Sequence, residues 1–453
     1  MSGQKDILLQ RIREHGEFTR GEMLSLIARL SVPSILAQIT STLLFFIDAA
    51  MVGSLGAESS AAIGLVESST WLFGSFTGAA SMGFSVQIAH RVGAGDFPGA
   101  RGVVRQALVS CALFSSFVAM VGAAISPFLP TWLGGGADIA PQASVYFAIF
   151  VGSLPLFQIY NLSMGMLKST GNMKVPSIVS VMMCVLDGLF NYLFIFQFHL
   201  GVTGAALGTA LAIAVSSIVI TWFALVRSDA LRLSHEPGRW IPQRHVLRKA
   251  LSISAPMALQ YVLMNGAQIV STIIVAPLGT IAIAAHSLAS TAESLCYMPG
   301  HGVGEAATTL VGQSLGAGEH GLQRSFGRLS VLSGMVVMAF MGLVMYIFAP
   351  ELMSLMTPVE AIRQLGADCL RIEAWAEPWF AAAIVSYACF VGAGDTFRPA
   401  CINLATMWGI RLTLAAILAP HYGLQGVWVA MALELTCRGL LLMWRLFRQK
   451  CPR

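Results

Sequence analysis

The segment GAALGTALAIAVSSIVITWFALV (204–226) contains no charged side chain. A helix that crosses a bilayer needs about 20 mostly apolar residues, so this segment is long enough to cross one. The chain contains eleven further stretches of comparable length and apolar character. The twelve expected spans are 30–53, 62–89, 104–127, 143–167, 175–198, 204–226, 252–276, 282–311, 329–349, 372–392, 400–419 and 425–447.

The composition of the 453 residues agrees with a membrane protein. Hydrophobic residues make up 56% of the chain and charged residues 11%, against about 45–50% and about 25% in soluble domains. These proportions exclude a soluble globular domain, a disordered chain, a collagen-like fibre and a disulfide scaffold. We therefore expect an all-α polytopic membrane protein.

Basic residues are distributed unevenly between alternate loops. One set of loops and both ends of the chain are rich in lysine and arginine, whereas the opposite loops contain only Arg363 and Arg371. Because positively charged loops stay on the cytoplasmic side, we expect cytoplasmic termini and a multi-pass protein of a prokaryotic inner (plasma) membrane. The basic residues behind the net charge of +5 set the orientation of a membrane protein. The positive charge therefore does not indicate a nucleic-acid partner, and none is expected.

The first half of the chain repeats in the second half at an offset of 223 residues. The matched pairs include Pro33 with Pro256, Gly95 with Gly318, Arg101 with Arg324, Pro155 with Pro378 and Gly171 with Gly394, and after the loss of one residue Gly201 meets Gly423. An even number of spans per repeat gives both halves the same orientation. This predicts two six-helix bundles related by a pseudo-two-fold axis along the membrane normal.

The repeat and the spans together define the expected domains. They are a cytoplasmic amino-terminal segment (1–29), an amino-terminal six-helix lobe (30–226), a cytoplasmic linker (227–251), a carboxy-terminal six-helix lobe (252–447) and a cytoplasmic tail (448–453). A binding site is expected near the middle of the membrane, within or between the lobes. A duplicated chain can enclose such a site by itself, so we expect a monomer.

Seven short motifs carry a resemblance to a known family. They are SVPSILAQ (31–38), IDAAMVGSLG (47–56), RVGAGDFPGARG (91–102), KSTGNMKVP (168–176), LDGLFNYLFIF (186–196), VGQSLGAGEHG (311–321) and VGAGDTFRP (391–399). Their order, spacing and duplication resemble the multidrug and toxic compound extrusion (MATE) family, within the wider flippase-like exporter superfamily. The resemblance covers residues 25–447. It implies antiport of amphipathic, cationic, drug-like small molecules against H⁺ or Na⁺ by alternating access.

Asp48 lies in the middle of the first span, between apolar neighbours. Placing an ionised carboxylate there costs at least ~2.5–3.5 kcal/mol. A carboxyl group avoids that cost by taking up a proton or by binding a cation, and either makes it a candidate coupling site. The alternative is a structural hydrogen bond to a neighbouring helix.

Asp187 and Asn191 lie four residues apart in the fifth span, so they share one helix face, and Thr209 lies in the sixth span. Their oxygen atoms suit a sodium ion or a proton in a hydrogen-bond network. In the MATE family this cluster has an acid on the first span, Asn followed by Asp on the fifth, and Thr on the sixth. Here the order is Asp followed by Asn, which moves the carboxylate by one helical turn. The alternative for this pair is a satisfied contact between helices.

The repeat does not duplicate this cluster, because Asp48, Asp187 and Asn191 fall on Ser271, Ile410 and Leu414. Another branch of the family couples ions through a Glu on the seventh span and an Asp on the tenth. Met264 and Phe380 occupy those positions here, which favours coupling in the amino-terminal lobe. Further acids of the carboxy-terminal lobe are Glu293, Glu305, Glu373, Glu377 and Glu434.

Four residues are candidates for substrate binding or gating. Pro33 removes a backbone hydrogen bond early in the first span and permits a bend. Asn161 matches a drug-contacting position of the family. Glu305 and Glu377 could attract cationic substrates or be hydrogen-bonded inside the bundle. Arg411 and Glu434 lie at similar depths and could form a structural ion pair.

A membrane enzyme is the competing class of protein. HEPGR (235–239) lacks the second His of a zinc-protease motif, and the chain contains no G-x(4)-GK[ST] phosphate loop. We expect no enzyme activity and no metal or cofactor besides the coupling ion. The alternative transporter function is a flippase for lipids or lipid-linked saccharides. Such a flippase would need a more cationic cavity than Arg411 alone supplies.

Overall fold

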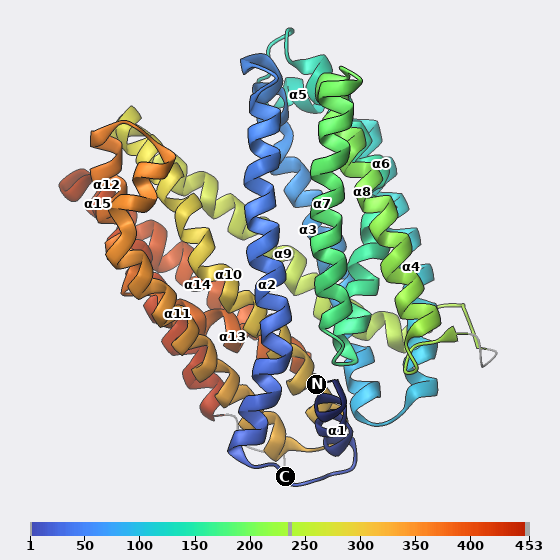
Figure 1. Cartoon of the computed structure of the whole chain (residues 1–453). Coiled ribbons are helices and arrows are strands. Elements are labelled where there is room, and N and C mark those ends of the chain that lie inside the picture. Colours follow the sequence, from blue (N-terminus) through green and yellow to red (C-terminus); the bar gives the residue numbers. More distant parts are fainter. Residues whose placement is uncertain (1, 234–237, 449–453) are drawn as a thin grey trace. The chain divides into compact units, whose positions relative to one another are not determined.

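The computed structural model describes residues 2–233 and 238–448, with the side chains of residues 2, 44–50 and 57 outside the description. Every regular element in these ranges is a helix (Figure 1). The first half contains α1 (Ser2–Arg13), α2 (Arg20–Gly53), α3 (Ala57–Gly93), α4 (Phe97–Ile125), α5 (Leu129–Trp132), α6 (Ala140–Ser169), α7 (Lys174–Tyr192), η1 (Leu193–Gln197), α8 (Gly201–Trp222) and η2 (Phe223–Arg227). The second half contains α9 (Arg244–Val275), η4 (Ala276–Leu278), α10 (Thr280–Gly316), α11 (His320–Met356), α12 (Glu360–Ala374), α13 (Glu377–Ala393), α14 (Phe397–Thr406), η5 (Met407–Arg411) and α15 (Leu412–Arg448).

The helices confirm the expected all-α membrane fold. Eight helical segments of the described chain are long and apolar enough to cross a membrane, and α12 with α13 makes a ninth across a 58° bend. One of the eight runs from Phe397 to Arg448 and is broken at Gly423, which separates the two last expected spans. The spans expected at 62–89 and 282–311 lie in α3 and α10, each 37 residues long. Small residues in these two helices lower their hydropathy, and such residues allow close helix packing in membranes.

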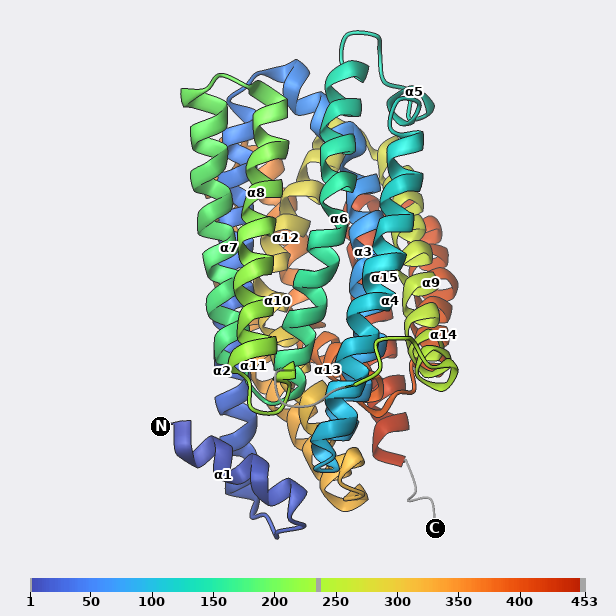
Figure 2. The ribbon, with the colours of Figure 1, turned by 90° about the vertical axis from the view of Figure 1, so that its right-hand side faces the viewer.

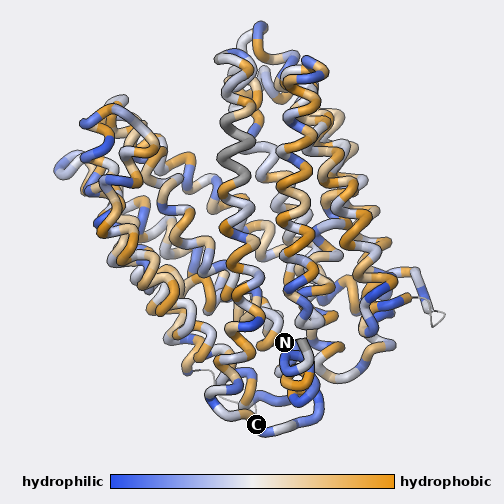
Figure 3. The backbone as a smooth tube through the Cα atoms, in the orientation of Figure 1, coloured by the Kyte–Doolittle hydropathy of each residue, from blue (hydrophilic) through white to orange (hydrophobic). Residues whose placement is uncertain are grey.

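Exposed apolar side chains follow one face of α4. On α4, Leu113, Phe117 and Met120 are 66%, 60% and 65% exposed. Their spacing of three and four residues places them on one helix face. Apolar colour covers the length of the helices and polar colour gathers near α1 and the loops (Figure 3). A stripe of this kind is suited to lipid contact.

The repeat is visible in the backbone as well as in the sequence. Gly95 and its counterpart Gly318 have φ of 72° and 78°, and Gly201 and Gly423 have φ of 56° and 60°. A side chain is strained at such positive φ, whereas glycine adopts it freely. The same turn geometry therefore ends the same helices in both halves, which explains why these loop glycines recur at the repeat offset.

The chain forms two compact units. The amino-terminal unit is Thr40–Ala258, and the carboxy-terminal unit combines Met1–Ile39 with Leu259–Arg453. The units follow the two halves of the sequence except for the first parts of α2 and α9. In the carboxy-terminal unit a Cβ added at Gly302 of α10 would lie 2.7 Å from the Ile35 nitrogen, and in the amino-terminal unit one at Gly83 of α3 would lie 2.5 Å from the Ala250 oxygen. Close packing against these glycines holds the first part of α2 in the carboxy-terminal unit and the first part of α9 in the amino-terminal unit.

The amino-terminal helix α1 belongs to the carboxy-terminal unit and packs near the start of α2 (Figure 2). Leu8, Leu9 and Ile12 are buried along its apolar face. Arg11 forms an ion pair of 2.6 Å with Glu22 of α2. The expected segment 1–29 is therefore structured over most of its length, whereas the expected tail at 448–453 lies outside the described residues apart from Arg448.

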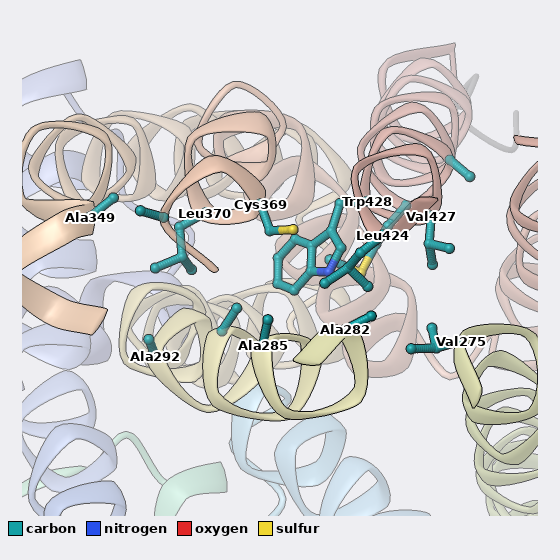
Figure 4. Packing of buried hydrophobic residues seen from close by; sticks show 14 of the residues in the cluster. Val275, Ala282, Ala285, Ala292, Ala349, Cys369, Leu370, Leu424, Val427 and Trp428 are labelled. Carbon is teal, nitrogen blue, oxygen red and sulfur yellow. The ribbon is translucent and has the colours of Figure 1, made fainter. Parts of the chain in front are cut away.

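The core of the carboxy-terminal unit surrounds Trp428 of α15, whose side chain is fully buried. Ala282 and Ala285 of α10 and Cys369 of α12 lie against the indole (Figure 4). The indole Nε1 donates a hydrogen bond of 3.2 Å to Nδ1 of His286. Small neighbours leave room for the large ring, and its one polar atom is satisfied.

Candidate functional site

The second part of α2 packs against α7 in the amino-terminal unit. The Ser41 and Ser180 hydroxyls lie 3.4 Å apart, and a Cβ added at Gly188 would contact the Met51 methyl group at 4.0 Å. Residue 48 falls between the two α2 contacts, and Asp187 falls between the two α7 contacts. The Asp48 side chain lies outside the described residues, but its backbone position is in α2, alongside the α7 segment that carries Asp187.

The predicted polar pair of the fifth span forms on α7. Asn191 is 0% exposed, and its Nδ2 donates a hydrogen bond of 3.2 Å to Oδ1 of half-buried Asp187. A Cβ added at Gly208 of α8 would lie 2.1 Å from the Asn191 Oδ1. The absence of a side chain at Gly208 therefore makes room for Asn191. Half-buried Thr209 is the next residue along α8, so the structure brings the segments of all three predicted residues together.

Asn161 takes part in a polar contact between α6 and α3. Its Nδ2 donates to the Thr77 hydroxyl at 3.1 Å. One turn away, the Gln158 amide donates to the Ser81 hydroxyl at 2.7 Å and to the Thr77 carbonyl at 3.1 Å. Gln158 and Thr77 were not predicted from the sequence. Gln158 lies three residues before Asn161, and Thr77 lies four residues before Ser81. Polar pairs at these spacings inside apolar spans are the signal that could have found them.

In the carboxy-terminal unit, the first part of α2 meets α10 near two predicted residues. The Gln38 amide donates to Oε1 of half-buried Glu305 at 3.4 Å. Half-buried Pro33 lies inside α2, five residues before Gln38. Glu305 therefore contacts a polar side chain of α2.

Glu377 is fully buried at the first residue of α13. Glu373, also fully buried, lies near the end of α12 on the other side of the 58° bend. The turn between them is closed by a backbone hydrogen bond of 2.7 Å, which the Ala376 N–H donates to the Glu373 carbonyl oxygen. Both carboxyl groups therefore face the interior of the unit at the break between two helices.

Glu434 forms its ion pair with Arg438 of the same helix, not with Arg411. The Arg438 Nε lies 3.0 Å from Glu434 Oε1, and the two side chains are 9% and 0% exposed. The Arg411 guanidinium instead contacts the sulfur atoms of Met407 and Met431. Arg438 was overlooked in the sequence. The spacing of four residues from Glu434 is the signal that could have found it.

Among the residues that the structure describes, no three His, Cys, Asp or Glu side chains are placed to hold a metal ion. The protein is thus a polytopic helical membrane protein with ionisable side chains inside its spans. Such side chains mark ion and substrate pathways in membrane proteins.

Comparison with known proteins identifies the family. The MatE family model matches residues 33–193 and again residues 256–417, and 256 lies 223 residues after 33. A probable multidrug resistance protein NorM of Thermotoga maritima is 27% identical over 432 residues, which cover 91% of this chain and 90% of that protein. The probable NorM of Neisseria meningitidis serogroup A is 27% identical over 444 residues, 94% of each chain.

Solved structures have the same fold. A MATE protein crystallised in complex with MaL6 has a TM-score of 0.90 at 21% identity, with 97% of each chain covered. A MOP superfamily transporter from Pyrococcus furiosus has a TM-score of 0.89 at 21% identity, with 97% of this chain and 96% of that chain covered. The chain belongs to the MatE family of multidrug efflux transporters. The resemblance and the all-α fold expected from the sequence are confirmed.

Proposed function

We propose that the chain is a secondary active antiporter that exports amphipathic organic cations in exchange for H⁺ or Na⁺. The observation that carries the proposal is the Asp187–Asn191 pair on α7, alongside the part of α2 that contains residue 48. Two carboxyl groups and oxygen donors at one level of a membrane protein attract a small cation. We further propose that both termini are cytoplasmic, that the membrane is a bacterial inner membrane and that the chain acts as a monomer.

The coupling step is the neutralisation of Asp48 and Asp187. An outward-facing state takes up the ion at these carboxylates, which removes the cost of their charge in the bilayer. Once its carboxyl group is neutral, α2 repacks and bends at Pro33. The drug then leaves. Asn161, Glu305 and Glu377 are proposed to contact or attract the substrate. The inward-facing state releases the ion and loads a new drug molecule.

The membrane potential is sufficient to drive useful export. One charge that moves inward down 100 mV supplies roughly 2.3 kcal/mol. Because ~1.4 kcal/mol corresponds to a tenfold ratio, the potential alone supports a drug gradient of about 40-fold. A pH or sodium gradient adds to this ratio.

The test is transport of a fluorescent cationic dye by proteoliposomes under separately imposed pH and sodium gradients. We compare the wild type with Asp48→Asn and Asp187→Asn, and use the exposed loop variant Asp138→Asn as the matched control. We expect one gradient to drive transport, both span variants to lose it and the control to retain it. If neither gradient affects transport, antiport is wrong and a lipid or lipid-linked saccharide flippase becomes the better hypothesis.

A further inference from the structure

The carboxy-terminal unit contains a second group of buried acids with no counterpart in the first. Glu373 and Glu377 lie on either side of the α12–α13 bend and are both 0% exposed. All four of their carboxylate oxygens lack a hydrogen-bond partner among the residues that the structure describes. A buried carboxylate without a partner is costly, so this arrangement needs a ligand or a proton.

Several elements supply the ionisable groups around these two acids. α10 contributes Glu293, Cys296 and Tyr297, which interact electrostatically with the acids or with one another. From α12, Cys369 lies near Glu373. η5 contributes Arg411, and α15 contributes the Glu434–Arg438 ion pair. α11 meets the Glu377 side chain with Gly342, where an added Cβ would lie 3.0 Å from the Glu377 Cβ.

The charges of this group do not balance when every acid is ionised. Glu434 and Arg438 compensate each other at 3.0 Å. Glu293, Glu373 and Glu377 then face the single positive charge of Arg411. Two uncompensated negative charges inside a membrane protein are far more costly than two neutral carboxylic acids. Electrical neutrality therefore requires about two protons on these three acids.

A proton fits this site better than a metal ion. Among the described residues no three His, Cys, Asp or Glu side chains are placed to hold a metal. Glu373 and Glu377 lie on the two sides of the α12–α13 bend. A change in this bend therefore alters the distance between their carboxyl groups. Glu373 interacts electrostatically with Glu377. Because neighbouring like charges disfavour each other's ionised form, the proton affinity of the pair depends on the distance between the two carboxyl groups.

The group is specific to this half of the molecule. At the repeat offset, Glu293, Glu373 and Glu377 fall on Thr70, Phe150 and Leu154. The group also differs from the positions of Met264 and Phe380, where another branch of the family has its coupling acids. It is therefore neither a copy of the Asp187 site nor that branch's site.

We propose that Glu293, Glu373 and Glu377 form a proton-carrying site of the carboxy-terminal unit that loads and releases at least one proton in each transport cycle. A carboxylate accepts the proton from a hydronium ion and leaves water, and the carboxylic acid later returns the proton to water on the opposite side. The proposal rests on the proposed antiport, to which it adds a proton beyond the ion bound at Asp48 and Asp187.

The number of coupled protons fixes the steady-state dye ratio. At zero membrane potential, each coupled proton supports a tenfold ratio for a pH difference of one unit. Proteoliposomes without sodium, with the potential clamped by potassium and valinomycin, give this ratio for a fluorescent cation. We expect Glu377→Gln and Glu373→Gln to reduce the ratio about tenfold relative to the wild type. The exposed α11 variant Glu351→Gln is the control that retains it.

A second measurement separates loss of the proton from loss of the fold. Infrared difference spectra of the purified protein, recorded as pH is changed, report the carbonyl band of protonated carboxylic acids. We expect a pH-dependent band that Glu373→Gln removes in part, while dye binding and thermal stability persist. An unchanged steady-state ratio in both glutamate variants overturns the proposal, even if the band is present, because that proton is then structural.

The two proposals fail in different ways. If sodium alone drives the wild type and pH has no effect, the proton site is wrong while antiport stands. If neither gradient drives the wild type, antiport itself is wrong.

Discussion

The two halves of this transporter have the same backbone plan and different interior chemistry. Gly95 and Gly318 share their positive φ, as do Gly201 and Gly423. The amino-terminal half places Asp187 and Asn191 on one helix face, where the other half has Ile410 and Leu414. The carboxy-terminal half instead buries Glu373 and Glu377 at a helix break. Turn geometry is therefore retained in both halves, while ionisable groups are placed independently in each.

The largest expected effect concerns the ion pair that only the carboxy-terminal half contains. Arg438→Met leaves Glu434 buried without its partner, which costs about 3–5 kcal/mol. The counterpart of Arg438 in the first half is Ser216. Thermal unfolding in detergent measures the loss, and Arg438→Met combined with Glu434→Gln is the control that should recover most of it. Equal stability of Arg438→Met and the wild type would show that the pair does not compensate Glu434.

A smaller effect is expected where the amino-terminal half makes room for its own polar pair. Gly208→Ala places a Cβ 2.1 Å from the Asn191 Oδ1, so Asn191 must move. Overpacking of this kind costs about 1–3 kcal/mol, and we expect gradient-driven dye transport to fall at least tenfold. Gly102→Ala, where nothing lies within 4 Å of the added Cβ, is the matched control. Normal transport by Gly208→Ala would remove Asn191 from the coupling site.

Two equivalent loop acids provide a direct test of the shared plan. Asp96 accepts a hydrogen bond of 2.9 Å from the Gly99 nitrogen and caps α4. Its counterpart Glu319 makes no side-chain cap at α11. Both acids form an ion pair, Asp96 with Arg91 at 2.6 Å and Glu319 with exposed His15 at 2.7 Å, so the cap is the difference between them. Asp96→Ala should cost about 0.5–2 kcal/mol, as for a lost helix cap.

The counterpart variant gives the smallest expected effect. Glu319→Ala removes only an exposed ion pair, so it should cost about 0.2–1 kcal/mol. Unfolding temperatures of the two alanine variants, measured side by side, check the difference. A larger loss for Glu319→Ala would mean that the contact between the α1–α2 turn and the α10–α11 loop stabilises the unit more than the cap does.

The fold was predictable because its determinants are local in the sequence. Spans follow from apolar length, and the repeat follows from prolines and glycines at one offset. The Asp187–Asn191 contact was predictable for the same reason, since four residues make one helical turn. The Asp48 side chain lies outside the described residues, so its role as a coupling site stays a prediction.

Other features depend on contacts between distant residues. Gln38 meets Glu305 across 267 positions of the sequence, and no local pattern indicates such a partner. The room that Gly208 leaves for Asn191 likewise depends on how α7 packs against α8. The Arg438–Glu434 pair was detectable by its spacing, whereas its effect on the charge balance around Glu373 required the packing of α10, α12, η5 and α15.

In the proposed antiport, drug and coupling ion exclude each other through the carboxylates of the amino-terminal unit. Proton or sodium release on addition of a fluorescent cation to the purified, weakly buffered protein tests it without any gradient. We predict release of the coupling ion from the wild type and from Asp138→Asn, and its loss in the Asp48→Asn and Asp187→Asn variants. Dye binding with no release of either ion from the wild type would contradict the claim.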